Sequence, residues 1–276
     1  MKPYKLLLSI AAVVAAVSCS TGDDIESRID KLLSQMTLDE KIGQMNMLTQ
    51  GEQEWMDGQI RSGAIGSFLN EVDPAVINRM QRIAVEESRL GIPLIASRDV
   101  IHGFRTIFPI PLGQGATFDR ELVERGARIA AIEAAACGIR WTFSPMLDVA
   151  RDPRWGRGQE TYGEDPYLTE RMGLAVVRGL QGPEDSKYRK LLACAKHFAV
   201  HSGPEWNRHS FNIENLPARD LWETYLPAFK ALVQKGNVAE VMCAYQRIDG
   251  EPCCGNTRDE QQILRDEWGF KGMIVS

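Results

Sequence analysis

One stretch of the chain, residues 148–166, gathers side chains that suit a ligand rich in hydroxyl groups. It combines Asp, Glu, Arg, Trp and Tyr residues with two Pro and three Gly residues, a mixture that predicts a loop. Guanidinium and carboxylate groups bond hydroxyls at fixed angles, and Trp155 offers an apolar face to C–H groups. The stretch therefore favours a polyhydroxylated ligand, although a solvated loop with its own ion pairs would have the same composition.

Polar side chains also follow predicted strands elsewhere in the chain. Lys196 and His197 are adjacent, so they can share a site only where their strand gives way to a loop. Asp99 ends an earlier strand, where its carboxylate could accept bonds from two hydroxyls or serve as an ion-pair partner or helix cap. Residues 205–209 add another loop with carboxylate, indole and guanidinium groups. For His197, a structural histidine in the core is the alternative.

No motif in the chain predicts a metal or another cofactor. His197 and His201 are four residues apart, which on a helix could hold a metal ion, but Pro204 and the preceding strand argue against such a helix. The cysteines after Cys19 form no C-x-x-C pair, which gives a zinc site no support. We therefore predict that the protein binds neither a metal nor a cofactor.

The cysteines allow one disulfide prediction. Most of them lie in apolar segments, where a cysteine packs as a small hydrophobic residue. Export would permit disulfides, and the pair we consider is Cys243 with Cys253 or Cys254.

The elements that would position these residues alternate between strand and helix. Strands are predicted over residues 63–69, 93–99, 139–143, 192–195, 238–244 and 272–276. Helices are predicted from residue 24, over 37–48, 73–89, 119–137, 165–180 and 217–235, and over 257–268. Thr37 and Thr257 each open a capping-box pattern, and Asp73, Asp119 and Asp165 are predicted helix caps.

This alternation predicts an α/β fold of parallel βα units. The polar residues follow the C-terminal ends of the strands, as they do in a (β/α)₈ TIM-type barrel. We predict such a barrel in incomplete form, with about six βα units. An open doubly wound sheet is the alternative, but it would usually show a glycine-rich phosphate turn after its first strand, and the sequence has none.

The bulk composition sets the class of protein. The chain has 276 residues, of which 44% are hydrophobic and 25% charged, as in an ordinary globular protein and unlike a multi-span membrane protein. The net charge is −5, and −5 − 2 = −7 without Lys2 and Lys5. An acidic chain argues against a nucleic-acid partner.

The N-terminus is predicted to be a targeting segment. Basic residues precede an apolar run, residues 6–17, that is too short to span a bilayer as a stable anchor. The run ends in Ala-Val-Ser-Cys19, which resembles a bacterial lipoprotein signal. We predict a signal peptide over 1–18, a lipidated Cys19, a tether over 19–24 and a periplasmic or outer-membrane location. An ordinary secretory signal is the alternative.

Several motifs together resemble glycoside hydrolase family 3. These are residues 148–166, Lys-His-Phe198, Ala-Tyr245 and residues 264–270, in that order along the chain. The family contains retaining β-glycosidases, including β-glucosidases and β-xylosidases, and the resemblance covers residues 25–276 as the family's N-terminal barrel domain. Carried over by position, it implies the following substrate-binding residues: Asp99, Arg157, Lys196, His197, Arg208 and Tyr245.

The resemblance implies a different position in the site for Tyr245 than for the residues of the loop over 148–166. Tyr245 would sit beside the nucleophile. Within residues 148–166 only Arg157 matches a ligand contact, and four other charged residues are expected to hold the loop in shape through ion pairs: Asp148, Arg151, Asp152 and Arg154.

The family's two catalytic carboxyl groups are not matched within the sequence. The nucleophile is an Asp expected directly after Ser276, and the acid/base Glu belongs to a later domain. Retaining hydrolysis needs both groups, about 5–5.5 Å apart. We therefore expect residues 1–276 to be the N-terminal part of an enzyme, to contain no catalytic residue and to be inactive alone.

The resemblance also implies a substrate. Asp99 in Arg-Asp-Val-Ile-His-Gly resembles the β-glucosidase pattern, whereas several xylosidases carry Glu, whose extra methylene would crowd a glucose hydroxymethyl group. We predict release of terminal non-reducing β-D-glucosyl residues from β-linked oligosaccharides or glycosides. Residues 201–205 look more like a xylosidase, so a β-xylosidase is one alternative, and a non-catalytic sugar-binding lipoprotein is another. The oligomeric state is not predicted.

Overall fold

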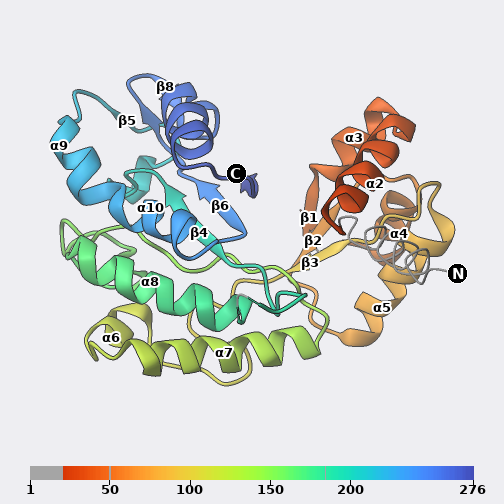
Figure 1. The fold of residues 1–276 in the computed structure, drawn as a ribbon, viewed down its shortest axis with the longest axis horizontal. Coiled ribbons are helices and arrows are strands. Elements are labelled where there is room, and N and C mark those ends of the chain that lie inside the picture. Colours follow the sequence, from red (N-terminus) through yellow and green to blue (C-terminus); the bar gives the residue numbers. More distant parts are fainter. Residues whose placement is uncertain (1–20, 50, 184) are drawn as a thin grey trace, which may run out of the picture.

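The computed structural model describes residues 21–49, 51–183 and 185–276 (Figure 1). The predicted signal peptide and Cys19 lie outside the described residues. Helix α2 (Thr21–Gln35) begins earlier than the sequence pattern indicated. None of the helices in the described ranges is long and apolar enough to cross a membrane.

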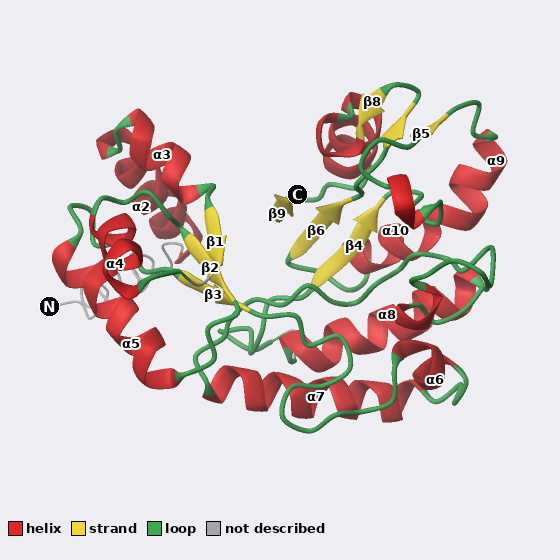
Figure 2. Cartoon of the chain, turned by 180° about the vertical axis from the view of Figure 1, so that it is seen from behind, coloured by secondary structure: helices red, strands yellow, loops and turns green. Residues whose placement is uncertain are grey.

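Two three-stranded parallel sheets form the inner part of the fold (Figures 1 and 2). The first contains β1 (Met47–Thr49), β2 (Ser67–Leu69) and β3 (Ile95–Ser97), with Ser67 paired to both Met47 and Ile95. The second contains β4 (Cys194–Phe198), β6 (Glu240–Cys243) and β9 (Met273–Val275). Neighbouring strands in each sheet follow the order of the chain, as the wall of a barrel requires.

Trp141 joins the two sheets. It forms parallel bridges to Ser97 at the end of β3 and to Leu192 just before β4. The predicted strand over 139–143 is therefore reduced to a single bridging residue. The parallel α/β architecture is confirmed, but barrel closure is not seen: within the described residues no pairing joins β9 to β1.

Local capping signals correctly located most helix starts. The capping box of Thr37 and Glu40 opens α3 (Leu38–Gln44), and the carboxylates of three Asp residues cap helices as predicted. The helices that they cap are α5 (Pro74–Arg82), α7 (Arg120–Ala136) and α8 (Pro166–Gln181). A short helix, α6 (Pro111–Gly115), precedes α7.

Other elements differ from the predictions. Residues 47–49 form β1 rather than the end of a helix, and α4 (Gln53–Arg61) was not predicted. Near the C-terminus, the cap of the helix Thr257–Glu267 is Asn256, whose side chain accepts a bond from the Asp259 amide, so the predicted capping box at Thr257 is wrong.

The predicted helix over 217–235 is divided. It consists of α9 (Ala218–Asp220), a wide helical turn over Leu221–Tyr225, and α10 (Pro227–Gln234). Pro227 has no amide hydrogen and cannot continue an α-helical bond ladder, which explains the break. A small sheet not predicted from the sequence contains β5 (Asn212–Ile213), β7 (Arg247–Ile248) and β8 (Glu251–Pro252).

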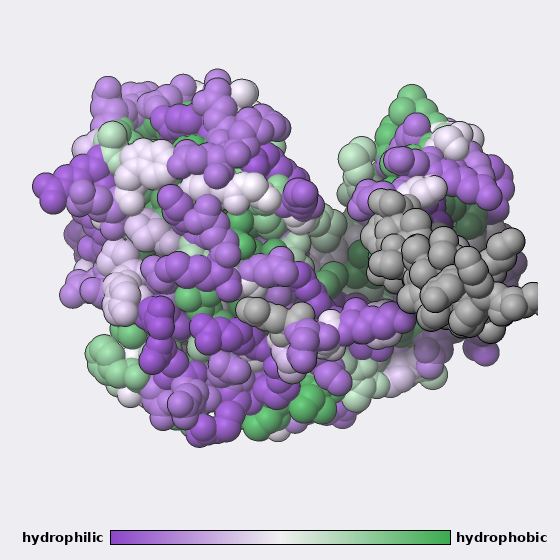
Figure 3. Space-filling model, in the orientation of Figure 1, coloured by the Kyte–Doolittle hydropathy of each residue, from purple (hydrophilic) through white to green (hydrophobic). Residues whose placement is uncertain are grey.

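Two apolar clusters stabilise the fold. The larger lies among α7, α8, α10 and the strands β4 and β6, and the smaller lies among α4, α5, β2 and β3. The surface is mostly hydrophilic on the face shown in Figure 3, where a notch separates the part formed by α2–α5 from the rest. Cys243 and Cys254 form a disulfide, one of the two pairings predicted, while Cys253 is buried as a free thiol.

Glu240 is a carboxyl group buried at the start of β6. It is 1% exposed, it accepts a hydrogen bond from the Trp141 indole, and its Oε1 atom has no partner. Burial raises the pKa of Glu240 to about 9. The folded state therefore retains a proton that the unfolded chain releases near pH 4.5. The stability that this proton provides is fully present below pH 4.5 and is lost as the pH rises through 9.

The variant Glu240→Gln should remove this pH dependence, since a glutamine still accepts from Trp141 and never ionises. We expect equal stability of variant and wild type near pH 4.5, and an advantage of the variant that grows by up to about 1.4 kcal/mol per pH unit above it. Urea unfolding at pH 4.5, 7 and 8.5 measures this difference. Parallel stability curves for the two proteins would show that Glu240 is not held neutral.

Candidate functional site

The six predicted ligand residues lie together at the C-terminal ends of the strands. Asp99 follows β3, Lys196 and His197 lie in β4, and Tyr245 follows β6. Arg157 and Arg208 come from the two long loops that cover these strand ends. The contacts described below link these residues in two groups, one at Asp99 and one around Tyr245.

Lys196 and Asp99 form the first group. The Lys196 ammonium lies 2.7 Å from Asp99 Oδ2, and its side chain is only 5% exposed, whereas the Asp99 side chain is 41% exposed. The other carboxylate oxygen of Asp99 accepts a bond from the Ile101 amide at 3.1 Å. A buried ammonium needs such a partner, and the exposed face of Asp99 remains accessible to a ligand. An open cavity of about 410 Å³ lies directly beside Asp99.

A bulge in β4 explains how two adjacent residues reach one site. Lys196 pairs with Met242, but Phe198 pairs with the next residue of β6, Cys243, so His197 is an extra residue in the strand. An extra residue interrupts the alternation of side chains between the two faces of a sheet. The prediction that the strand must end before Lys196 and His197 is wrong, because the strand continues and bulges instead.

His197 is held in one protonation state by its neighbours. Its Nδ1 atom lies 2.7 Å from Asp148 Oδ2, and its Nε2 atom lies 3.3 Å from Arg157 Nη1. A guanidinium group only donates, so the Nε2 atom of His197 must accept. The Nδ1 atom must then carry the ring proton and donate a hydrogen bond to Asp148. Burial and the charges of Arg157 and Lys196 lower the pKa of His197 well below its usual range. Burial also raises the pKa of Asp148 to about 7.

Arg157 is oriented by Glu160. Its Nε and Nη2 atoms donate to the two carboxylate oxygens of Glu160 at 2.7 and 2.8 Å, a forked pair that fixes the plane of the guanidinium group. Burial opposes ionisation of Glu160, but Arg157 holds its pKa below the usual range. The remaining Nη1 atom faces His197 and, at 3.4 Å, the hydroxyl of Tyr245.

Arg208 completes the second group. Its guanidinium carbon lies 4.4 Å from the centre of the Tyr245 ring, and its Nη1 atom donates to Glu205 at 2.9 Å. Glu205 also accepts a bond from the Trp155 indole at 2.7 Å. These bonds connect the loop over residues 148–166 to the loop after β4.

The loop over residues 148–166 differs from its predicted organisation. Asp152 and Arg154 form an ion pair within the loop as expected, but Arg151 pairs outside it with Asp220. Asp148 is buried beneath His197 and does not hold the loop through an ion pair with an Arg side chain. Trp155 is 8% exposed, so its ring packs in the interior instead of forming an open apolar face.

Glu160 was not predicted to be functional, and Glu205 was predicted only as the carboxylate of the loop over residues 205–209. Each lies three positions from the arginine that it orients, a spacing that the sequence shows. His201 and Gln246, which also border the site, carry no such signal.

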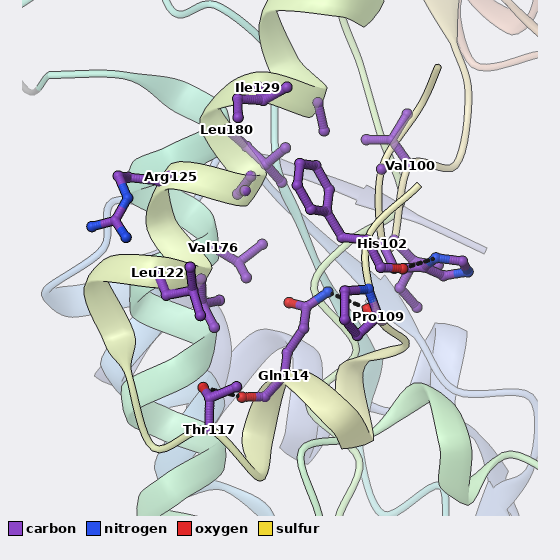
Figure 4. Close-up of a pocket in the computed structure, with 17 residues that line it drawn as sticks. Val100, His102, Pro109, Gln114, Thr117, Leu122, Arg125, Ile129, Val176 and Leu180 are labelled. Carbon is purple, nitrogen blue, oxygen red and sulfur yellow. Dashed lines mark hydrogen bonds between the residues drawn. The ribbon is translucent and has the colours of Figure 1, made fainter. Parts of the chain in front are cut away.

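An apolar cavity lies elsewhere, behind residues 100–109 and against α7 (Figure 4). It measures about 220 Å³, and polar side chains in its wall already bond to the backbone: His102 to Phe108, Gln114 to Pro109 and Thr117 to Gln114. A cavity with these walls suits a hydroxylated ligand less well than the charged cluster around Tyr245 does. Within the described part of the chain, no group of three or more His, Cys, Asp and Glu residues could hold a metal ion.

Comparison with known proteins places the chain in a family. Residues 37–276 match the model of the glycosyl hydrolase family 3 N terminal domain. A xylan 1,4-beta-xylosidase of Xylanibacter ruminicola is 56% identical over 188 residues, which cover 62% of this chain and 22% of that protein. A periplasmic beta-glucosidase of Salmonella typhimurium is 39% identical over 259 residues, which cover 93% of this chain and 34% of that protein.

Solved structures show the same fold. A beta-glucosidase from Listeria innocua, in complex with laminaribiose, aligns with a TM-score of 0.80 and 37% identity over 91% of this chain and 37% of the other. The chain thus spans between about a fifth and two fifths of the length of these relatives.

Proposed function

The chain belongs to glycoside hydrolase family 3, and we propose that it forms the sugar-binding part of an exported β-glucosidase that releases terminal non-reducing β-D-glucosyl residues. The observation that carries this proposal is that Asp99 pairs with Lys196, while the next residue, His197, contacts both Arg157 and Tyr245. Charged donors and acceptors at fixed positions suit the hydroxyl groups of one pyranose ring. In this proposal the wall of parallel strands is part of a (β/α)₈-type barrel.

Each residue of the cluster then has a role in binding. Asp99 accepts bonds from sugar hydroxyls, while Lys196, Arg157 and Arg208 donate. His197 contributes an acceptor at Nε2, where a sugar hydroxyl would replace the Arg157 donor at 3.3 Å, because its Nδ1 proton is directed to Asp148.

The carboxylates of the cluster do not suit nucleophilic attack. Asp99 is paired with Lys196, Glu160 with Arg157, and Glu205 with Arg208. A cation held this close stabilises the charge of a carboxylate and reduces its nucleophilicity. We therefore propose that the two catalytic carboxyl groups lie outside residues 1–276, with the nucleophile directly after Ser276, on the strand next to β6.

The length of the Asp99 side chain and the Salmonella relative support glucose as the glycone. A β-xylosidase is the second candidate, because the Xylanibacter relative is 56% identical over its matched part.

The periplasmic name of the Salmonella relative supports export. Lipidation of Cys19 is part of the proposal, and loss of radiolabelled palmitate incorporation in Cys19→Ser would test it.

Hydrolysis of two aryl glycosides by the full-length protein tests the substrate. We expect a higher kcat/KM for the aryl β-D-glucoside than for the β-D-xyloside, since the Asp99 side chain is one methylene shorter than a glutamate. The reverse order would establish the β-xylosidase instead. Binding of glucose without hydrolysis of either glycoside would support a sugar-binding lipoprotein.

A further inference from the structure

Gln246, the residue after Tyr245, is a buried amide with a fixed orientation. It is 2% exposed, and its Nε2 atom donates to the carbonyl oxygens of Ala199 and Val200 at 2.8 and 3.2 Å. Carbonyl oxygens only accept, so the NH₂ end of the amide must face them. Its Oε1 atom therefore faces His201 Nδ1 at 3.3 Å, and that nitrogen must carry a proton.

The other ring nitrogen of His201, Nε2, lies beside a carboxylate without forming a hydrogen bond. His201 is 3% exposed, and its Nε2 atom lies 3.4 Å from Glu205 Oε1 without a hydrogen-bond partner. If the ring is neutral, the lone pair of Nε2 faces a carboxylate oxygen. If the ring is charged, the same atom donates to that oxygen. One proton thus separates a repulsive contact from an ion pair between the buried His201 ring and the partly exposed Glu205 carboxylate.

Glu205 transmits this difference to the sugar site. The same Oε1 atom receives the Trp155 indole bond at 2.7 Å, and Oε2 receives the Arg208 guanidinium bond at 2.9 Å. Arg208 in turn lies 4.4 Å from the centre of the Tyr245 ring. A shift of the Glu205 carboxylate would therefore move a residue that we place in sugar binding.

We propose that His201 is a positioning residue of the sugar site, which holds Glu205, and through it Arg208, when a proton occupies Nε2. The binding of a sugar at this site rests on the proposed function, whereas the contacts among Gln246, His201 and Glu205 do not depend on it. We expect sugar affinity to increase with acidity over the range in which His201 becomes charged.

The surroundings of His201 decide where that range lies. Its ring contacts His197, Tyr245 and Trp155, at centre-to-centre distances of 5.0, 5.0 and 5.5 Å. Burial lowers the pKa of His201 from its usual 6.5, and the positive charge of Arg157 and the neighbouring His197 act in the same direction. The charges of Asp148 and Glu205 act in the opposite direction. The ion pair with Glu205 therefore forms as the pH falls below 6.5.

Nitrogen NMR of the full-length protein labelled with ¹⁵N-histidine tests the arrangement without any substrate. The variant His201→Phe, which keeps an aromatic ring, assigns the His201 signals. At pH 8 we expect a proton on Nδ1 and none on Nε2, and between pH 8 and 4.5 we expect Nε2 to gain a proton. In Glu205→Gln this titration should move to lower pH, because the anionic partner is lost. A neutral ring with its proton on Nε2, or a titration unaffected by Glu205→Gln, would overturn the proposal.

Kinetics test the effect on the sugar site. The KM of the wild type for an aryl β-glucoside should fall about threefold to tenfold from pH 8 to pH 4.5, the size of one ordinary hydrogen bond, because the charged contact at Glu205 acts on the sugar only through Arg208. This change should be absent in His201→Phe, in Glu205→Gln and in the double variant. Glu223→Gln, which removes an exposed carboxylate paired with Arg219, should retain it. A KM that changes with pH equally in all variants would show that His201 does not position Glu205 and Arg208. Absence of hydrolysis would contradict the proposed function but would leave the NMR result decisive.

Discussion

The variant Asp99→Asn should lower kcat/KM for an aryl β-glycoside by about 10²- to 10⁴-fold. Two hydrogen bonds from sugar hydroxyls to a charged carboxylate, each contributing about 1.5–3 kcal/mol, account for this range. The change also leaves the buried Lys196 ammonium without its charged partner at 2.7 Å. Steady-state kinetics of the full-length protein, with circular dichroism to establish folding, measures the effect.

A double variant separates binding from charge balance. If Asp99 and Lys196 only neutralise each other and neither binds sugar, then Lys196→Met in the Asp99→Asn background should restore activity, since no buried charge remains. We expect the double variant to be as stable as the wild type or more so, yet no more active than Asp99→Asn. Recovery of kcat/KM to within tenfold of the wild type would contradict a direct role of Asp99 in binding.

The variant Asp148→Asn should lower kcat/KM by about 10²- to 10³-fold, although Asp148 is buried and touches no ligand. The asparagine can turn its NH₂ group to His197 Nδ1, and this would move the ring proton to Nε2, where it meets the Arg157 guanidinium at 3.3 Å. In enzymes where a buried carboxylate fixes the tautomer of a catalytic histidine, exchange of Asp for Asn lowers kcat by about 10⁴-fold. We expect a smaller loss here because His197 binds the sugar and takes no part in proton transfer.

Asp152→Asn is the matched control for Asp148→Asn. It makes the same chemical change in the same loop but removes only a surface ion pair with Arg154, which contributes about 0–1 kcal/mol. We expect its kcat/KM to stay within threefold of the wild type. Equal losses in both variants would indicate that the loop as a whole, and not the tautomer of His197, supports activity.

The structure shows which features could be predicted from the sequence. Helix starts were predictable at Thr37, Asp73, Asp119 and Asp165, because a cap depends on residues within one turn. The position of Lys196 and His197 inside β4 was not predictable in the same way, because the bulge that contains His197 depends on pairing with β6.

Long-range partners were not predictable. Asp148 bonds His197 at a separation of 49 residues, and Trp155 bonds Glu205 at a separation of 50. Composition alone suggested an ion pair for Asp148 and an open aromatic face for Trp155. Likewise β5 and β7 pair across a long segment, with too few residues in either strand to show an alternating pattern.

A crystal structure of the full-length protein with bound D-glucose would show whether the Asp99–Lys196 pair holds the sugar. We predict one glucose ring whose hydroxyl groups bond Asp99, Lys196 and His197, with Arg157 and Arg208 at its rim and an aspartate after Ser276 facing the anomeric carbon. Glucose bound elsewhere, such as the apolar cavity against α7, with the Asp99–Lys196 pair unoccupied, would contradict the account.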